Sequence, residues 1–175
     1  MALLDIFSSS DSRKAKAPQG RSQPGDMDIL DKLKAEHDEV KALLGKLVDS
    51  GKAAERTALL KKIKAALVPH TRAEEKVVYD AILAVRGDKE AKVDGNEGYY
   101  EHAHADMALK TLAGIKPATS PEFTAAAKVL KELVEHHVQE EERNVWRDVR
   151  KHFNAEQRTE MNRKFETAKK RVKVS

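Results

Sequence analysis

Two short stretches of the chain carry a histidine followed four residues later by a glutamate. The first reads PHTRAEE and contains His70 and Glu74, and the second reads HHVQEEE and contains His137 and Glu141. Residues four apart lie one turn apart on the same face of a helix. Each pair falls in an otherwise apolar stripe with steps of three and four residues, the spacing of a buried helical seam. An imidazole and a carboxylate are costly to bury without a partner, so two such seams predict one shared metal centre.

Histidines also occupy core positions in two further predicted helices. His37 falls in a regular apolar stripe, and His102 precedes Leu109 and Leu112 by the same steps that separate His37 from Leu44 and Leu47. A single histidine in such a stripe is more often a hydrogen-bonded core residue than a ligand. Taken together, however, the residues predicted to face inward are too many for packing alone: His37, His70, Glu74, His102, His137 and Glu141.

The donor types limit the metal. The chain has no cysteine, so any metal must be held by nitrogen and oxygen. Zinc prefers about four ligands in a closed tetrahedron. Six donors shared by two cations, roughly 3.5–4 Å apart, suit iron or manganese better and leave positions open for water, O₂ or peroxide. The donor set therefore predicts two metal ions per chain, iron or manganese, close enough to share an oxo or hydroxo bridge.

Metal-binding histidines usually donate their second ring N–H to an acceptor outside the metal shell. Residues of a suitable type near the predicted donors are Glu36, Glu101, Asp106 and Tyr79. Sequence spacing alone does not say which histidine each of them would serve.

The apolar periodicity and the capping signals predict five helices, which cover about residues 28–50, 53–86, 99–115, 120–152 and 154 onwards. Glycine-rich residues 87–97 predict a loop, and Pro69 predicts a kink or a break in the second helix. The first helix resembles the third and the second resembles the fourth. This repeat predicts an all-α fold, an up-down four-helix bundle with an additional C-terminal helix.

Composition agrees with a helical domain. Of 175 residues, 35% are charged and only 5% aromatic. We expect a flexible tail over residues 1–26, rich in Ser, Lys, Pro, Gln and Gly, and a bundle domain over residues 27–175. The net charge of +4 argues only weakly for nucleic acid, which we do not expect as a partner. No apolar run approaches the roughly 18 residues that span a bilayer, and the start carries Asp5, so we expect no membrane association, no signal peptide and a cytoplasmic location.

These motifs resemble the bacterial hemerythrin-like family, also called the HHE cation-binding domain. The resemblance covers about residues 28–172, and the segments that carry it are LKAEHDEV at 33–40, PHTRAEE at 69–75, Glu101-His102, and LVEHHVQEEE at 133–142. It implies a non-haem di-iron centre inside a four-helix bundle. By the same resemblance, the six inward residues named above are the metal ligands, and Glu74 and Glu141 bridge the two irons.

The chain departs from the oxygen-carrying members of that family at one position. Those proteins place two histidines one turn apart on the third helix, whereas the residue one turn after His102 is Asp106. Either Asp106 is an unusual ligand, or one iron has an extra open site. The difference favours chemistry with O₂, peroxide or nitric oxide over stable carriage of O₂.

The second motif also leaves its register open. His136 and Glu140 have the same spacing as His137 and Glu141, although alignment with the first motif favours the latter pair. The neighbouring residues Glu75 and Glu142 could also substitute as ligands.

We predict a di-iron protein that binds or senses O₂ or NO, or that handles iron or peroxide. One alternative is an enzyme that decomposes peroxide, as a catalase does, or reduces O₂, since an open position on iron is all that such chemistry requires. A further alternative is an iron-dependent module that regulates a protein partner. No dedicated acid–base pair stands out, so whether the protein is an enzyme stays open.

Overall fold

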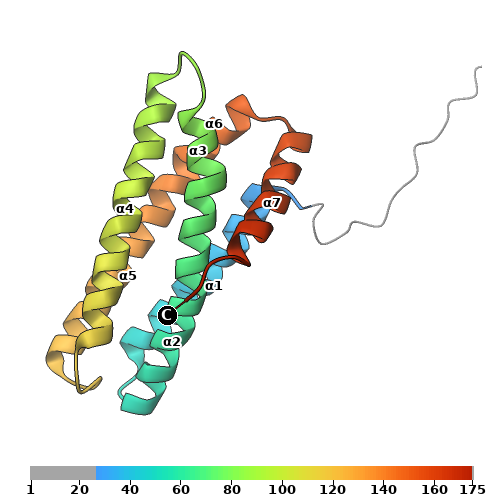
Figure 1. Ribbon diagram of the computed structural model, residues 1–175. Helices are drawn as coiled ribbons and strands as arrows, with labels where there is room; N and C mark the ends of the chain where they lie inside the picture. The colour runs from blue at the N-terminus through green and yellow to red at the C-terminus, as the bar shows by residue number, and fades with distance from the viewer. Residues whose placement is uncertain (1–26, 175) are drawn as a thin grey trace, which may run out of the picture.

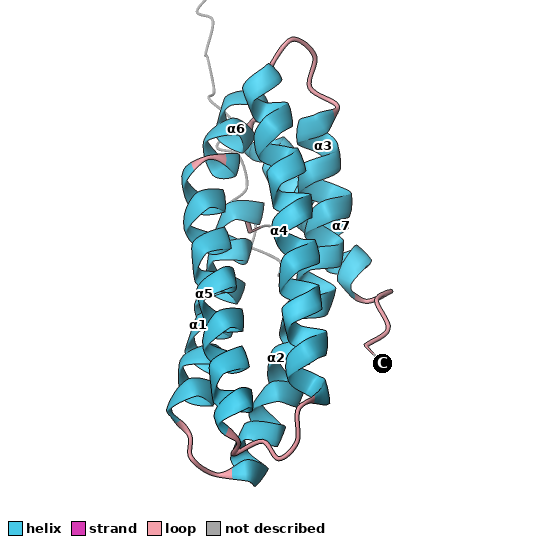
Figure 2. Ribbon diagram, turned by 90° about the vertical axis from the view of Figure 1, so that its left-hand side faces the viewer, coloured by secondary structure: helices cyan, strands magenta, loops and turns pink. Residues whose placement is uncertain are grey.

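The computed structural model describes residues 27–174, and the predicted tail over residues 1–26 lies outside this part. Long helices run up and down beside one another, and a shorter helix packs on one side (Figure 1, Figure 2). The elements are α1 (Ile29–Asp49), α2 (Ala53–Glu74), the π-helical turn η1 (Glu75–Tyr79), α3 (Asp80–Leu83), α4 (Lys89–Gly114), α5 (Pro121–Arg143), α6 (Val145–His152) and α7 (Ala155–Lys169). The predicted all-α bundle with an added C-terminal helix is confirmed. Within the described residues, no helix is both long and apolar enough to cross a bilayer.

The helix starts follow the capping signals in the sequence. The Asp28 carboxylate accepts a hydrogen bond from the Leu30 N–H at 3.0 Å, and α1 begins directly after it. Asn154 and Gln157 form a reciprocal capping box at the start of α7, where the sequence predicts the fifth helix to begin. These side chains satisfy backbone N–H groups that a helix start leaves without partners.

The loop predicted over residues 87–97 is wrong, because most of it is helix. α4 begins at Lys89, well before the predicted start at Tyr99, and the Asp88 carboxylate caps it. The glycines that suggested a loop, Gly95 and Gly98, are buried on the inner face of α4. They allow a neighbouring helix to approach closely instead of turning the chain.

The closest approach lies at Gly98. A Cβ atom there would sit 2.5 Å from the Cζ atom of Tyr79, whose side chain is fully buried. We therefore expect Gly98→Ala to lower the free energy of unfolding by about 1–3 kcal/mol through overpacking. Gly45→Ala is the control, because nothing lies within 4 Å of its added Cβ and alanine is the better helix former. Urea unfolding of both variants tests this, and equal stabilities would contradict it.

The two helices that carry the His–Glu pairs become irregular directly after them. α2 continues through Pro69 to Glu74, so the alternative of two separate helices is wrong, and the chain then passes into the π-helical turn η1. The predicted fourth helix is likewise divided, because Asn144 (φ −95°, ψ −62°) separates α5 from α6. Single π turns often occur at functional sites. Two aromatic residues lie at these irregularities: Tyr79 is the last residue of η1, and Trp146 is the second residue of α6.

Two separate apolar clusters fill the bundle. One contains Val40, Leu44, Leu67 and Leu109, and the other contains Leu33, Ala73, Tyr79, Trp146 and Phe165, each with further members. The predicted donors lie between them along the chain, since His37 falls between Leu33 and Val40 and His70 between Leu67 and Ala73. A polar layer therefore divides the core, and apolar packing holds it from both sides.

Candidate metal centre

The structure brings all six predicted donors together at this polar layer. His37 comes from α1, His102 from α4, His70 and Glu74 from α2, and His137 and Glu141 from α5. Each of the six is at most 6% exposed. The helical register inferred from periodicity therefore places every one of them inside the bundle.

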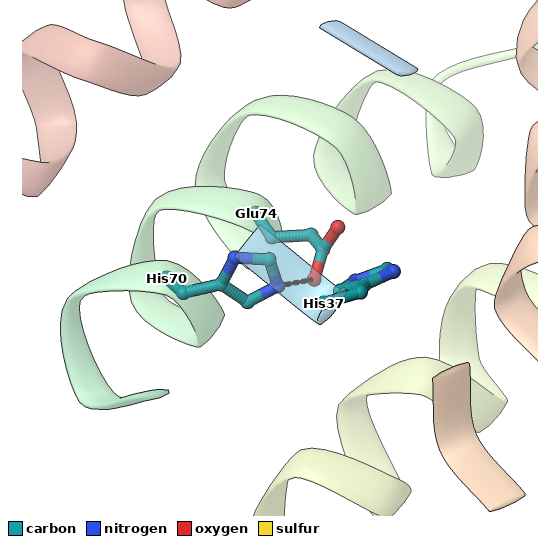
Figure 3. Close-up of side chains that lie close together, drawn as sticks. All are labelled: His37, His70 and Glu74. Atoms are coloured by element: carbon teal, nitrogen blue, oxygen red, sulfur yellow. Dashed lines mark ion pairs between the residues drawn. The ribbon is translucent and has the colours of Figure 1, made fainter. Parts of the chain in front are cut away.

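Glu74 faces one imidazole on each side of the layer. Its Oε2 atom lies 3.3 Å from the Nε2 atom of His70 and 3.5 Å from the Nε2 atom of His102. Figure 3 shows His70 and Glu74 on successive turns of α2, with His37 approaching from another helix. Donor atoms of His37, His70 and Glu74 lie within 4.8 Å of one another, and so do those of Glu74, His102 and His137. One carboxylate is thus shared by two groups of possible ligands.

Glu141 occupies the corresponding place on α5. Its Oε2 atom lies 3.3 Å from the Nε2 atom of His37 and 3.6 Å from the Nε2 atom of His137. Each carboxylate therefore contacts one histidine of the His37–His70 pair and one of the other pair. Two carboxylates placed between two histidine pairs are the arrangement that a pair of bridged cations requires.

Within the part of the chain that the structure describes, the innermost polar atoms of this layer have no hydrogen-bond partners. They include both carboxylate oxygens of Glu74, both of Glu141 and the Nε2 atom of His37. Buried polar groups in proteins are normally satisfied, and an unpaired buried carboxylate is especially unfavourable. Because these atoms converge on shared spaces and are of types that bind iron, the residues fit a pair of metal ions.

The outward nitrogen of each imidazole, by contrast, is satisfied by a carboxylate. The distances from the histidine Nδ1 atom to the glutamate oxygen are 3.1 Å for His37–Glu142, 3.0 Å for His70–Glu36, 3.1 Å for His102–Glu75 and 2.7 Å for His137–Glu101. Such a bond fixes the tautomer, so that Nδ1 carries the proton and Nε2 points inward with its lone pair. All four histidines are thus oriented for metal binding.

These four contacts repeat the internal symmetry of the chain. Glu36 and Glu101 directly precede His37 and His102, and each binds the histidine of the next long helix. Glu36 and Glu101 were expected in this role. Glu75 and Glu142 were considered only as substitute ligands, whereas the structure places them against the Nδ1 atoms of His102 and His37. In both motifs a second glutamate directly follows the inner one, and this repeat in the sequence could have indicated the role of Glu75 and Glu142.

The remaining candidates do not join the inner donors. Asp106 is paired with Arg72, which also binds Glu75 at 2.8 Å, so it supports the outer shell instead of supplying a ligand. His136 has a side chain that is 65% exposed, and the structure therefore favours His137 in the second motif. The Tyr79 hydroxyl lies 3.4 Å from the Nε2 atom of His102, on the inner side, so Tyr79 is not an Nδ1 acceptor.

Two aromatic contacts were not foreseen. Trp146 stacks on His37, with ring centroids 5.9 Å apart and an angle of 13° between the planes. Phe165 of α7 meets His70 edge-on at 5.8 Å. Both rings exclude water from one histidine pair and restrict its rotamers.

The electrostatics of the layer favour positive charge. Burial opposes charging of His37, but its contacts with Glu141 and Glu142 raise its pKa to about 10. His102 behaves alike, with burial opposed by Glu74 and Glu75, and its pKa is raised to about 9. Burial and the nearby charge of Glu74 raise the pKa of Glu141 to about 7. A metal ion must displace protons from these groups, so its binding releases protons and weakens as the pH falls.

The outer carboxylates give a direct prediction. Glu101→Ala is expected to lower metal affinity about 10- to 100-fold, because His137 loses the bond that orients it. Competition with a chelator measures this change. The control is Glu135→Ala, whose partly exposed carboxylate binds Lys131 on the same helix. Equal weakening in both variants would show that the effect is not specific to the outer shell.

Comparisons with known proteins agree with a metal-binding site in this domain. The family described as hemerythrin HHE cation binding domain matches residues 28–149. A DNA nickase from Nostoc sp. strain PCC 7120 is 27% identical over 151 residues, which are 86% of this chain and 42% of that protein. The chain thus spans less than half the length of this relative. No solved structure matches the chain.

Proposed function

The chain belongs to the hemerythrin HHE cation-binding family, and from that premise we propose that its buried layer holds two iron ions that bind a small ligand, O₂ or nitric oxide. His37 and His70 would hold one ion and His102 and His137 the other. Glu74 and Glu141 would be shared between them. The observation that carries the proposal is that each of these two buried carboxylates faces one imidazole from each pair while its oxygens lack hydrogen-bond partners.

The donor count supports binding of an external ligand. Two imidazoles and two shared carboxylates give each ion four protein donors, and non-haem iron with open positions is the type of centre that reacts with O₂. Bound iron would supply the affinity for a diatomic molecule. The protein's own residues orient the donors, keep water out and hold the negative charge between the helices.

A small cavity beside the histidines indicates the kind of ligand. It measures about 10 Å³ and is lined by Val40, Leu67, Val134 and Val138 next to His37 and His70. Thr71 also lines it, but its hydroxyl donates to the Val68 carbonyl at 3.2 Å. A cavity of this size holds about one very small molecule. Its apolar wall favours O₂ or NO over a ligand that requires several hydrogen bonds.

Peroxide decomposition or O₂ reduction is the second candidate, and Tyr79 favours it. Burial and the surrounding carboxylates, Glu141 and Glu74 first, hold the pKa of Tyr79 well above its usual value. Its hydroxyl therefore stays protonated at neutral pH, 3.4 Å from the Nε2 atom of His102. A buried O–H group at this position would donate a hydrogen bond to a reduced ligand and so stabilise the negative charge that develops on it.

Metal analysis and the absorption spectrum of protein made under iron-replete conditions test the proposal. We expect two irons per chain and the absorption band of a bridged ferric pair. Protein that folds equally well without metal, or with a single zinc, would contradict it. Reversible O₂ or NO binding without turnover would favour the binding role. Rapid consumption of hydrogen peroxide, slowed by Tyr79→Phe, would favour the enzyme.

The relative's printed name, DNA nickase, describes that longer protein. We propose no DNA cleavage at this centre, because donors that are at most 6% exposed are out of reach of a duplex phosphodiester. The iron-loaded protein is expected to leave supercoiled plasmid intact, which gel electrophoresis shows directly.

A further inference from the structure

The repeat in the chain allows the two approaches to the metal layer to be compared position by position. α4 and α5 correspond to α1 and α2, with His102 matching His37 and His137 matching His70. If both halves served only to hold metal, their approaches would be similar. They differ sharply in charge and in what covers them.

The approach between α4 and α5 is acidic. A cavity of about 10 Å³ lies there, next to Tyr79 and Gly98, and its carboxylates are those of Asp94, Glu97, Glu101, Glu140 and Glu141. Glu97 is exposed to solvent, whereas Glu141 is 2% exposed. Glu141 is the innermost of these carboxylates, and neither of its oxygens has a hydrogen-bond partner among the described residues. It is also one of the proposed metal ligands. The carboxylates therefore lead from solvent to the centre itself.

The matching approach between α1 and α2 is apolar and covered. The residues that correspond to Asp94, Glu97, Gly98 and Glu140 are Ile29, Lys32, Leu33 and Ala73, and of the acidic residues on α4 only Glu101 has a carboxylate counterpart, Glu36. Ile29, Leu33 and Ala73 belong to one buried cluster with Met161 and Phe165 of α7. α7 packs on α1, α2 and η1, as the red helix in Figure 1 shows. Lys32 is itself engaged by Glu36 and Glu166.

We propose that divalent metal ions enter and leave the centre through the acidic passage between α4 and α5, defined by Asp94, Glu97, Glu101 and Glu140. This inference rests on the proposed function, since it concerns how the same centre is filled. Carboxylate oxygens suit a hydrated divalent ion, and they can replace its water ligands one at a time. An acidic cleft also raises the local cation concentration and the association rate by about 10- to 1,000-fold.

The dimensions of the passage define how it works. A cavity of about 10 Å³ holds about one water, so the ion must lose part of its water shell and the lining side chains must move aside. Arg143 binds Glu140, and Arg147 binds Asp94, both from the solvent side. Their side chains are 63% and 47% exposed, so an arriving cation can displace them. The partly exposed Arg143–Glu140 pair is of a kind that contributes little free energy, so a cation can replace that arginine at low cost.

The double variant Glu97→Gln/Glu140→Gln tests the proposal, because neither residue is among the six inner donors. Metal-free protein is mixed with Co²⁺ at low ionic strength in a stopped-flow instrument, and the cobalt absorbance reports filling. We expect the uptake rate to fall at least about tenfold, with the final stoichiometry unchanged. Added salt should slow the wild type more than the variant, because it screens the charges that the variant lacks. Release of Co²⁺ to excess chelator should slow as well.

The matched control is Glu122→Gln/Glu132→Gln, which removes the same charge from exposed positions elsewhere on α5. Its uptake rate is expected to equal that of the wild type. Normal stoichiometry with an unchanged rate in the passage variant, or equal slowing in the control, would overturn the passage alone. Failure of the wild type to take up metal would overturn the proposed centre itself, and the passage with it.

Discussion

Glu74→Ala is expected to reduce the metal content from two ions per chain to nearly none. Glu74 lies 3.3 Å from the Nε2 atom of His70 and 3.5 Å from that of His102, so one substitution removes a donor from both halves of the centre. A histidine variant such as His70→Ala should instead weaken one half more than the other. Metal analysis after dialysis, together with the absorption spectrum, distinguishes these outcomes.

The neighbouring residue Glu75 provides the matched control. Its carboxylate binds the outer Nδ1 atom of His102 at 3.1 Å and Arg72 at 2.8 Å, and does not face the inner nitrogens, so Glu75→Ala should lower affinity about 10- to 100-fold without abolishing binding. Metal-free Glu74→Ala should be less stable than the metal-free wild type, because the buried imidazoles of His70 and His102 lose the carboxylate that they face. A Glu74→Ala protein that keeps two irons would show that Glu74 is not shared between them.

Loading with iron is expected to raise the melting temperature by roughly 8–16 °C for each ion bound, and so by about 16–32 °C when both sites are filled. Metal that binds only the folded state at a thousandfold excess over its Kd adds about 4 kcal/mol per site. In a domain of about 150 residues, each kcal/mol shifts Tm by about 2–4 °C. The effect should be large here because the buried oxygens of Glu74 and Glu141 have no hydrogen-bond partner among the described residues. Calorimetry of the metal-free and loaded protein measures it.

Glu74→Ala serves as the control for this measurement too, and its melting temperature should not respond to iron. Glu135→Ala, which alters a partly exposed ion pair, should respond as the wild type does. A similar rise in the Glu74→Ala variant would show that iron stabilises the fold from a different site.

Local patterns in the sequence determined the fold class and which histidine and glutamate side chains face the core. A histidine and a glutamate four residues apart must share a helix face, and the apolar residues on that face must turn inward to leave water. For this reason the six residues from His37 to Glu141 could be predicted to face inward without a structure, and all six are buried. The caps at Asp28 and Asn154 are equally local, and the helices begin where these residues predict.

Glycine was the feature that local reasoning misread. Gly95 and Gly98 suggested a loop, whereas they lie inside α4 where Leu83 and Tyr79 pack closely against its backbone. Glycine occurs both in turns and where two helices pack closely, and which of the two it does depends on whether another helix lies against it. Sequence patterns within one element contain no information about that neighbour.

Contacts between helices were decided only by the tertiary structure. The Nδ1 atom of His37 binds Glu142, which lies 105 residues away in the chain. Asp106, which the sequence left open as a metal ligand, forms an ion pair with Arg72 instead. Periodicity fixes which way a side chain points from its own helix. It does not fix the axial offset or rotation of the adjacent helix, and these two quantities determine which carboxylate meets which imidazole. The same two quantities determine that α7 covers the approach between α1 and α2, whereas the acidic approach between α4 and α5 leads to solvent.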